Sequence, residues 1–75
     1  MEVDSFGFMH AVAVLYDYVK NSNKNFLKFT KKTQQEIGLN RIQLNKAIKR
    51  LVDKGVLEFD RGKNIRIYRI VRQKL

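Results

Sequence analysis

Residues 38–55 have the sequence GLNRIQLNKAIKRLVDKG, with a glycine at each end and no proline between them. Asn40, followed three residues later by Gln43, is the signature of a capped helix start. Gly55 is typical of the residue that ends a helix. The stretch therefore predicts a helix over residues 41–54. Apolar residues at helical spacing define its buried side, and these are Leu44, Ala47, Ile48, Leu51 and Val52.

The residues at the N-terminus predict another helix and then a short strand. Asp4 or Ser5 can cap a helix over residues 6–20, which we expect to be well buried because its apolar stripe is wide. That stripe consists of Phe8, Val12, Leu15 and Val19, flanked by Met9, Ala13 and Tyr16. Residues 25–29 are rich in aromatics and bounded by polar residues, which favours a brief strand.

A short helix over residues 31–37 is expected next, and two starts are open for it. Thr30 is one possible cap, whereas Thr33 with Glu36 three residues later is the capping-box pattern and gives a later start. Leu39, in the connection to the following helix, is expected to fill the space between the two helices.

The remaining sequence has the alternation of a β-hairpin. Residues 56–70 contain two runs of alternating apolar and polar side chains, separated by the turn cluster DRGKN. If Ile65 and Ile67 face inward, Arg66 faces outward. We therefore expect one α+β domain with three helices, a short strand and a C-terminal hairpin.

Charge is distributed unevenly along the chain. Sixteen Lys and Arg against seven Asp and Glu give a net charge of +9, and the sequence pI is near 10.2. Residues 1–19 hold three acids and no base, so they carry −3, whereas residues 20–75 hold sixteen bases and four acids and carry +12. A domain pI above about 9 is the usual electrostatic footprint of nucleic-acid binding.

Several classes of function lack the residues they need. The chain has no cysteine and one histidine, His10, which lies in an apolar helix pattern and is expected to be structural. Acids occur singly and no glycine-rich phosphate loop is present, so we expect neither an enzyme nor a cofactor or small-molecule ligand. No apolar run is long enough for a membrane span and no secretory leader is recognisable. We expect a cytoplasmic protein, of a prokaryotic cell, of a virus-infected host cell or of the nucleoid.

The order helix, strand, helix, helix, hairpin resembles a winged helix-turn-helix domain. The resemblance rests on Gly38-Leu39-Asn40, on the apolar stripe from Leu44 to Leu51, and on Asp53-Lys54-Gly55-Val56-Leu57. It is similar to MarR-like and related repressors and to the winged domains of phage and plasmid replication initiators, and it covers about residues 8–71. One departure is that Lys32 and Thr33 stand where such domains usually have an aliphatic residue and Ala, which predicts a shifted or shortened second helix.

The resemblance implies double-stranded DNA as the partner, with the helix over residues 41–54 in the major groove. The implied role is a transcriptional regulator or the DNA-binding module of a replication initiator. Side-chain chemistry nominates base contacts from Arg41, Ile42, Gln43, Asn45 and Lys46. Phosphate contacts are expected from Lys31, Lys32, Gln34, Lys49 and Arg50, and hairpin contacts from Arg61, Lys63, Asn64 and Arg66.

Some alternatives stay open. Ile42 lies off the apolar stripe, and it can either pack against the end of the preceding helix or contact a thymine methyl group. A protein–protein assembly role predicts an apolar or acidic recognition face, and RNA binding would draw on Phe59 and Tyr68. A homodimer could use the surplus hydrophobic residues of the first helix, which are Phe6, Met9, Tyr16 and Tyr18.

Overall fold

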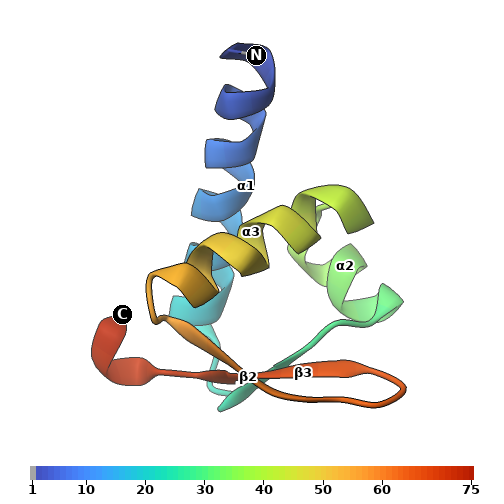
Figure 1. The fold of residues 1–75 in the computed structure, drawn as a ribbon, viewed down its shortest axis with the longest axis vertical. Helices are drawn as coiled ribbons and strands as arrows, with labels where there is room; N and C mark the ends of the chain where they lie inside the picture. Colours follow the sequence, from blue (N-terminus) through green and yellow to red (C-terminus); the bar gives the residue numbers. More distant parts are fainter. Residues whose placement is uncertain (1) are drawn as a thin grey trace.

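The computed structural model describes residues 2–75, with side chains described from Met9 onward. It is an α+β fold with three α-helices, a three-stranded antiparallel sheet and a short 3-10 helix (Figure 1). The elements in order are α1 (Glu2–Asn21), β1 (Phe26–Lys28), α2 (Lys31–Ile37), α3 (Arg41–Asp53), β2 (Leu57–Gly62), β3 (Arg66–Ile70) and η1 (Arg72–Lys74). The α+β class and the order of elements predicted from the sequence are thereby confirmed.

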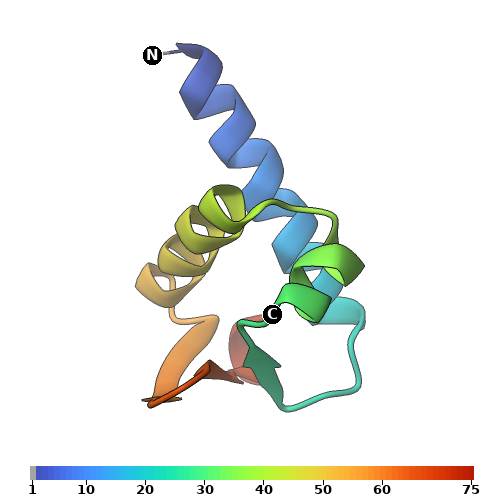
Figure 2. The ribbon, with the colours of Figure 1, turned by 90° about the vertical axis from the view of Figure 1, so that its right-hand side faces the viewer.

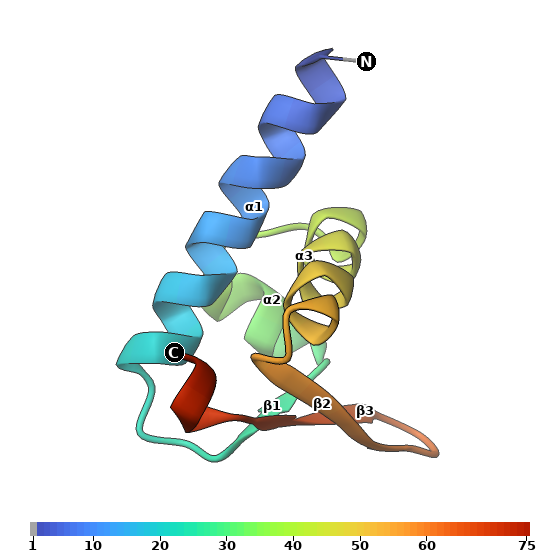
Figure 3. The ribbon, with the colours of Figure 1, turned by 60° about the vertical axis from the view of Figure 1, so that its left-hand side comes forward.

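The three helices lie on one face of the sheet (Figure 2). β3 is the central strand and pairs antiparallel with β1 on one side and with β2 on the other. α1 packs mainly against α3, and its N-terminal half extends beyond the other helices (Figure 3). No helix among residues 2–75 is long and apolar enough to cross a membrane.

Among the described side chains, one cluster of buried residues joins the helices to the sheet. Its largest fully buried members are Leu15, Val19, Leu44, Ile48, Leu51 and Leu57. Leu39, in the turn between α2 and α3, is buried in the same cluster, as the sequence predicts. The sheet contributes Leu27, Tyr68 and Ile70 to the same cluster.

The start and the buried face of α1 differ from the prediction. The helix begins at Glu2, so Asp4 and Ser5 lie within its first turns and the predicted cap at either residue is wrong. Acidic residues are favourable throughout the first turn of a helix, so they do not mark where it starts. The buried stripe consists of Ala11, Leu15 and Val19, while Met9 and Ala13 are exposed. The side chains of Phe6 and Phe8 lie outside the described residues.

The connection between α2 and α3 is fixed by local hydrogen bonds. Thr30 caps α2, because its Oγ1 accepts from the Thr33 amide at 3.1 Å, and the earlier of the two predicted starts is therefore confirmed. Gly38 ends the helix with φ of +86°, a left-handed conformation that side chains other than glycine disfavour. Asn40 then caps α3 by accepting from the Gln43 amide at 2.8 Å.

The C-terminal residues fold back onto the end of α1. The Tyr16 hydroxyl donates to the Leu75 carbonyl at 3.0 Å. The Arg72 guanidinium donates to the Ser22 carbonyl at 2.6 Å and also to the carbonyl of Lys24. We call these contacts the C-terminal clasp, because they join residues 72–75 to α1 and to the segment between α1 and β1.

Candidate nucleic-acid interface

The side of α3 that faces away from the core is polar and basic. Its buried stripe is the predicted one, with Leu44, Ala47, Ile48 and Leu51 buried and Val52 partly buried. The exposed residues are Arg41, Ile42, Asn45, Lys46, Lys49 and Arg50. The helix therefore carries a surface with four cations, and Asp53 at its far end is the first acid along it.

Ile42 is 68% exposed, so the expectation that it packs against the end of α2 is wrong. Leu39 takes the space between the two helices instead, because it is only 6% exposed. Ile42 is thus an apolar side chain on the surface, beside the cation Arg41 and close to the start of the helix.

Gln43 has a structural role in addition to any binding role. Its Oε1 accepts from the Asn40 amide at 3.1 Å, which completes a capping box with the Asn40 side chain. A bidentate contact to adenine needs both the oxygen and the nitrogen of the amide group. In this conformation the Gln43 oxygen is already engaged, whereas the exposed Asn45 amide makes no hydrogen bond with other described residues.

Arg66 faces the helices rather than the solvent side of the hairpin. It lies on the same side of β3 as the buried residues Tyr68 and Ile70, so the prediction that it points out of the hairpin is wrong. Its guanidinium carbon lies 4.3 Å from the centre of the Phe29 ring, in cation–π contact. It also donates a long hydrogen bond of 3.5 Å to the Tyr68 hydroxyl. The spacing of Arg66, Tyr68 and Ile70 is compatible with this shared face, but Ile65 and Ile67 have the same spacing on the other face, so the sequence did not indicate it.

The tip of the hairpin presents exposed polar residues. Lys63 and Asn64 are exposed in the turn between β2 and β3. Arg61 is exposed as well, but its Nε lies 2.9 Å from the Asp60 carboxylate, so its charge is partly balanced. A second ion pair, between Arg69 and Glu58, lies on the outer face of the sheet.

Two grooves bring α2, α3 and the hairpin together. The first, here called the helix groove, is a space of 440 Å³ between α3 and the hairpin, lined by Asn45, Lys46, Ile48, Lys49, Val52, Phe59, Arg66 and Tyr68. The second, the tip groove, has a volume of 270 Å³ and is lined by Phe29, Gln34, Arg41, Asn64 and Arg66. Arg66 belongs to both, so the two grooves adjoin.

The lining of the two grooves contains cations and no acid. The cations are Arg41, Lys46, Lys49 and Arg66, and amide side chains come from Gln34, Asn45 and Asn64. The N-terminal end of α3, the whole of α2 and the tip of the hairpin lie on one side of the molecule (Figures 1 and 2). The grooves thus bring together seven of the fourteen residues that the sequence nominates, one or more from each of the three elements.

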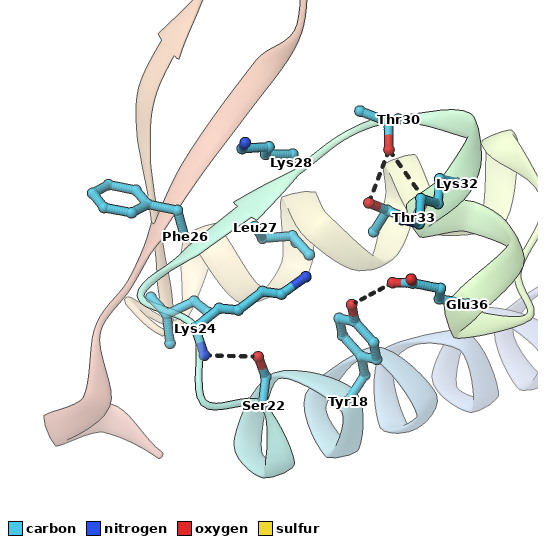
Figure 4. Close-up of a pocket in the computed structure, with 11 residues that line it drawn as sticks. Tyr18, Ser22, Lys24, Phe26, Leu27, Lys28, Thr30, Lys32, Thr33 and Glu36 are labelled. Atoms are coloured by element: carbon cyan, nitrogen blue, oxygen red, sulfur yellow. Dashed lines mark hydrogen bonds between the residues drawn. The ribbon is translucent and has the colours of Figure 1, made fainter.

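The other nominated residues do not line these grooves. Ile42, Gln43 and Arg50 lie elsewhere on α3, Lys31 lies at the start of α2, and Arg61 and Lys63 lie on the hairpin. Lys32 lines a third pocket, of 290 Å³, between α1, β1 and α2 (Figure 4). The same pocket is lined by Tyr18 and Glu36.

Tyr18 and Glu36 link α1 to α2 in this third pocket. The Tyr18 hydroxyl donates to the Glu36 carboxylate at 3.1 Å (Figure 4). Burial raises the pKa of the Tyr18 hydroxyl, and the hydrogen bond to Glu36 and its negative charge raise it further. Lys24 extends along the pocket toward this pair. The pocket has cations and a carboxylate together, unlike the two grooves.

The predicted dimer surface on α1 is used in part within the chain. Tyr16 and Tyr18 both donate hydrogen bonds to residues of the same chain, whereas Met9 is 70% exposed. His10 is exposed, and no group of three or more His, Cys, Asp or Glu side chains gathers among the described residues.

Comparisons of the chain with protein-family models, with curated proteins and with solved structures found no match.

Proposed function

We propose that the chain is a winged helix-turn-helix domain that binds double-stranded DNA in a sequence-specific manner, as a transcriptional regulator. The observation that carries the proposal is the composition of the helix groove and the tip groove, which together expose four cations and three amide groups and no acid. Neutralising phosphates requires cations, and distinguishing base pairs requires hydrogen-bonding side chains beside them.

The dimensions of α3 suit the major groove of DNA. A helix of 13 residues is about 20 Å long, and with its side chains it is about 10–12 Å wide. The major groove is about 12 Å wide and admits one helix. In this arrangement the hairpin lies on the neighbouring phosphates or in the adjoining minor groove, with Lys63 and Asn64 at its tip.

Individual roles follow from chemistry and position. Asn45 is the best placed candidate for adenine, since its amide is exposed and makes no hydrogen bond with other described residues, and Arg41 and Lys46 suit guanine. Lys49 and Arg50, further from the start of the helix, are assigned to phosphates. Gln34 and Lys31 at α2 are also assigned to phosphates.

Selection of binding sites from random duplex DNA tests the proposal, with Asn45→Ala and Lys49→Ala measured beside the wild type. Asn45→Ala should relax the preference at one position, by about 1–3 kcal/mol. Lys49→Ala should weaken all sequences by a similar factor, because a phosphate contact carries no sequence information. The exposed Lys20, in the last turn of α1, lines neither groove and gives the matched control Lys20→Ala.

Two outcomes separate the alternatives. Enrichment of one duplex sequence by the wild type, with a weaker preference at one position for Asn45→Ala, supports specific DNA binding. The position of such sites relative to promoters or replication origins then decides between a transcriptional regulator and a replication-initiator module. If no duplex is enriched and all three variants bind as the wild type does, the DNA-binding proposal fails, and a role in protein–protein assembly becomes the better explanation.

A further inference from the structure

The helix groove contains an aromatic side chain that contacts with a duplex leave unused. Phe59 lies on the same side of β2 as Leu57, two residues earlier, yet Phe59 is 58% exposed whereas Leu57 is fully buried. α3 and the hairpin diverge toward the hairpin tip (Figure 1), and the Phe59 side chain is correspondingly less covered than that of Leu57. The Phe59 ring therefore forms one wall of the groove without being covered by it.

The ring of Phe59 is held in a defined position. It packs edge-to-face on the cross-strand Tyr68, with ring centres 5.6 Å apart and an angle of 73° between the planes. Gly62 leaves space for it, since a Cβ atom at that position would lie 2.8 Å from Cζ of Phe59. A ring fixed in this way presents a flat apolar surface at little further entropic cost.

Cations surround this aromatic wall. Lys46 and Lys49 lie across the groove on α3, and Arg66 lies at its end, where Phe29 and Tyr68 hold the guanidinium. No carboxylate lines the groove. A ligand that fits this chemistry has a flat apolar part next to a negative charge, and the volume of 440 Å³ lies within the range of about 300–1,000 Å³ typical of ligand sites.

We propose that the helix groove binds an unpaired nucleotide, with its base stacked on Phe59 and its phosphate near Lys49 and Arg66. Within a duplex the faces of the bases are covered by their neighbours, so an aromatic ring can stack only on a base that has left the helix. The inference rests on the proposed function, and it adds a preference for a junction between double-stranded and single-stranded DNA over a continuous duplex.

The test compares four kinds of DNA probe by fluorescence anisotropy. They are a blunt duplex, the same duplex with a short thymine extension at either strand end, the same extensions made of abasic residues, and the free single strand. The duplex is the one enriched by selection, or a random duplex at low salt if none is enriched. We expect the duplex with a thymine extension of one polarity to bind about 5- to 100-fold more tightly than the blunt duplex. The corresponding abasic extension should increase the affinity much less.

Phe59→Leu keeps an apolar side chain but removes the flat ring, so it should lose the gain from the extension while its affinity for blunt duplex stays within twofold. Phe59→Trp should restore the gain. Phe26→Leu is the matched control, because Phe26 is also a partly exposed aromatic residue but faces the opposite side of the sheet. Thermal unfolding of each variant checks that it is folded.

The outcomes distinguish this inference from the function on which it rests. If the blunt duplex binds but the gain is equal with abasic extensions, or survives in Phe59→Leu, the nucleotide site is wrong and duplex binding stands. If Phe59→Leu weakens blunt and extended probes alike, the ring contacts the duplex and the inference is also wrong. If only the single strand binds, and binds through Phe59, the groove proposal holds and the duplex proposal fails. If no probe binds, both are wrong.

Discussion

Ile42 illustrates how one side chain can separate folding from recognition. It is 68% exposed next to the cations of α3, whereas Ile48, two turns nearer the C-terminus, is 2% exposed. Ile42 makes little contribution to the core, so a substitution of Ile42 should affect binding and leave stability almost unchanged.

We expect Ile42→Ala to change the free energy of unfolding by no more than about 0.5 kcal/mol, because no buried contact is lost. Ile48→Ala, the control, should cost about 2–5 kcal/mol. In the random-duplex selection Ile42→Ala should lose a thymine preference at one position, worth about 0.8 kcal/mol for one methyl-sized contact. Chemical denaturation of both variants and the selected sequences provide the measurements. A loss of stability in Ile42→Ala as large as that in Ile48→Ala would contradict this assignment.

Gln43 allows the cap of α3 to be separated from any contact with DNA. Gln43→Glu keeps an acceptor for the Asn40 amide and adds a negative charge at a helix N-terminus, so the unfolding free energy should be equal to or above that of the wild type. The same charge should weaken binding to every duplex at least several-fold. Gln43→Ala should instead lower stability by about 0.5–1 kcal/mol. Paired melting and anisotropy measurements distinguish the two roles, and equal DNA affinity for Gln43→Glu and wild type would place residue 43 away from DNA.

At the scale of elements, the helices with strong local signals could be predicted and those without could not. α3 was predictable because the Asn40–Gln43 cap, its apolar stripe and Gly55 all agree with one another. The sequence of α2 allowed two starts. In the structure the helix begins after Thr30, whose side chain accepts a hydrogen bond from the Thr33 amide. The start of α1 was not predictable, since Asp4 and Ser5 are compatible with both a cap and a first turn.

The face of a strand is harder to predict when both faces carry apolar residues. In β3 the alternatives were Ile65 with Ile67 or Tyr68 with Ile70, and sequence alternation alone cannot choose between them. The buried face of β3 is set by the neighbouring strands. Leu27 in β1 lies opposite Tyr68 and Leu57 in β2 lies opposite Ile70, and all four residues are buried. The sequence nominated Arg66 but not its place beside Phe29 and Tyr68 in the grooves, because that neighbourhood depends on which face of β3 is buried.

The link between α1 and α2 should make stability depend on pH in alkaline solution. The pKa of Tyr18 is raised by burial and by Glu36 in the folded state, so the neutral hydroxyl is favoured there. Its contribution is fully present below the unfolded-state pKa of about 10 and is lost as pH rises through the folded-state value. Denaturation between about pH 8 and 11 should show a fall in stability that is shallower in Tyr18→Phe. An identical fall in that variant would assign the effect to other groups.

At the scale of the whole molecule, the positive charge is the property most open to direct measurement. Among residues 20–75 the chain carries +12, and four cations line the two grooves without a carboxylate. If about six phosphates are neutralised, the logarithm of the binding constant should fall with the logarithm of salt concentration with a slope of about −5. Lys49→Ala should reduce the slope by about one, and Lys20→Ala should leave it unchanged. A wild-type slope near zero would exclude binding through phosphates.

The C-terminal clasp also has a consequence for the order in which the molecule folds. Tyr16 and Leu75 are 59 residues apart, so their contact requires nearly the whole chain to be in place, and contacts of this range form late. Interactions absent from the transition state act on the unfolding rate and leave the folding rate almost unchanged. Arg72→Gln, which weakens the clasp, should therefore speed unfolding several-fold in stopped-flow experiments at a constant folding rate. We therefore expect the last residues to set how long the native state persists once it has been reached.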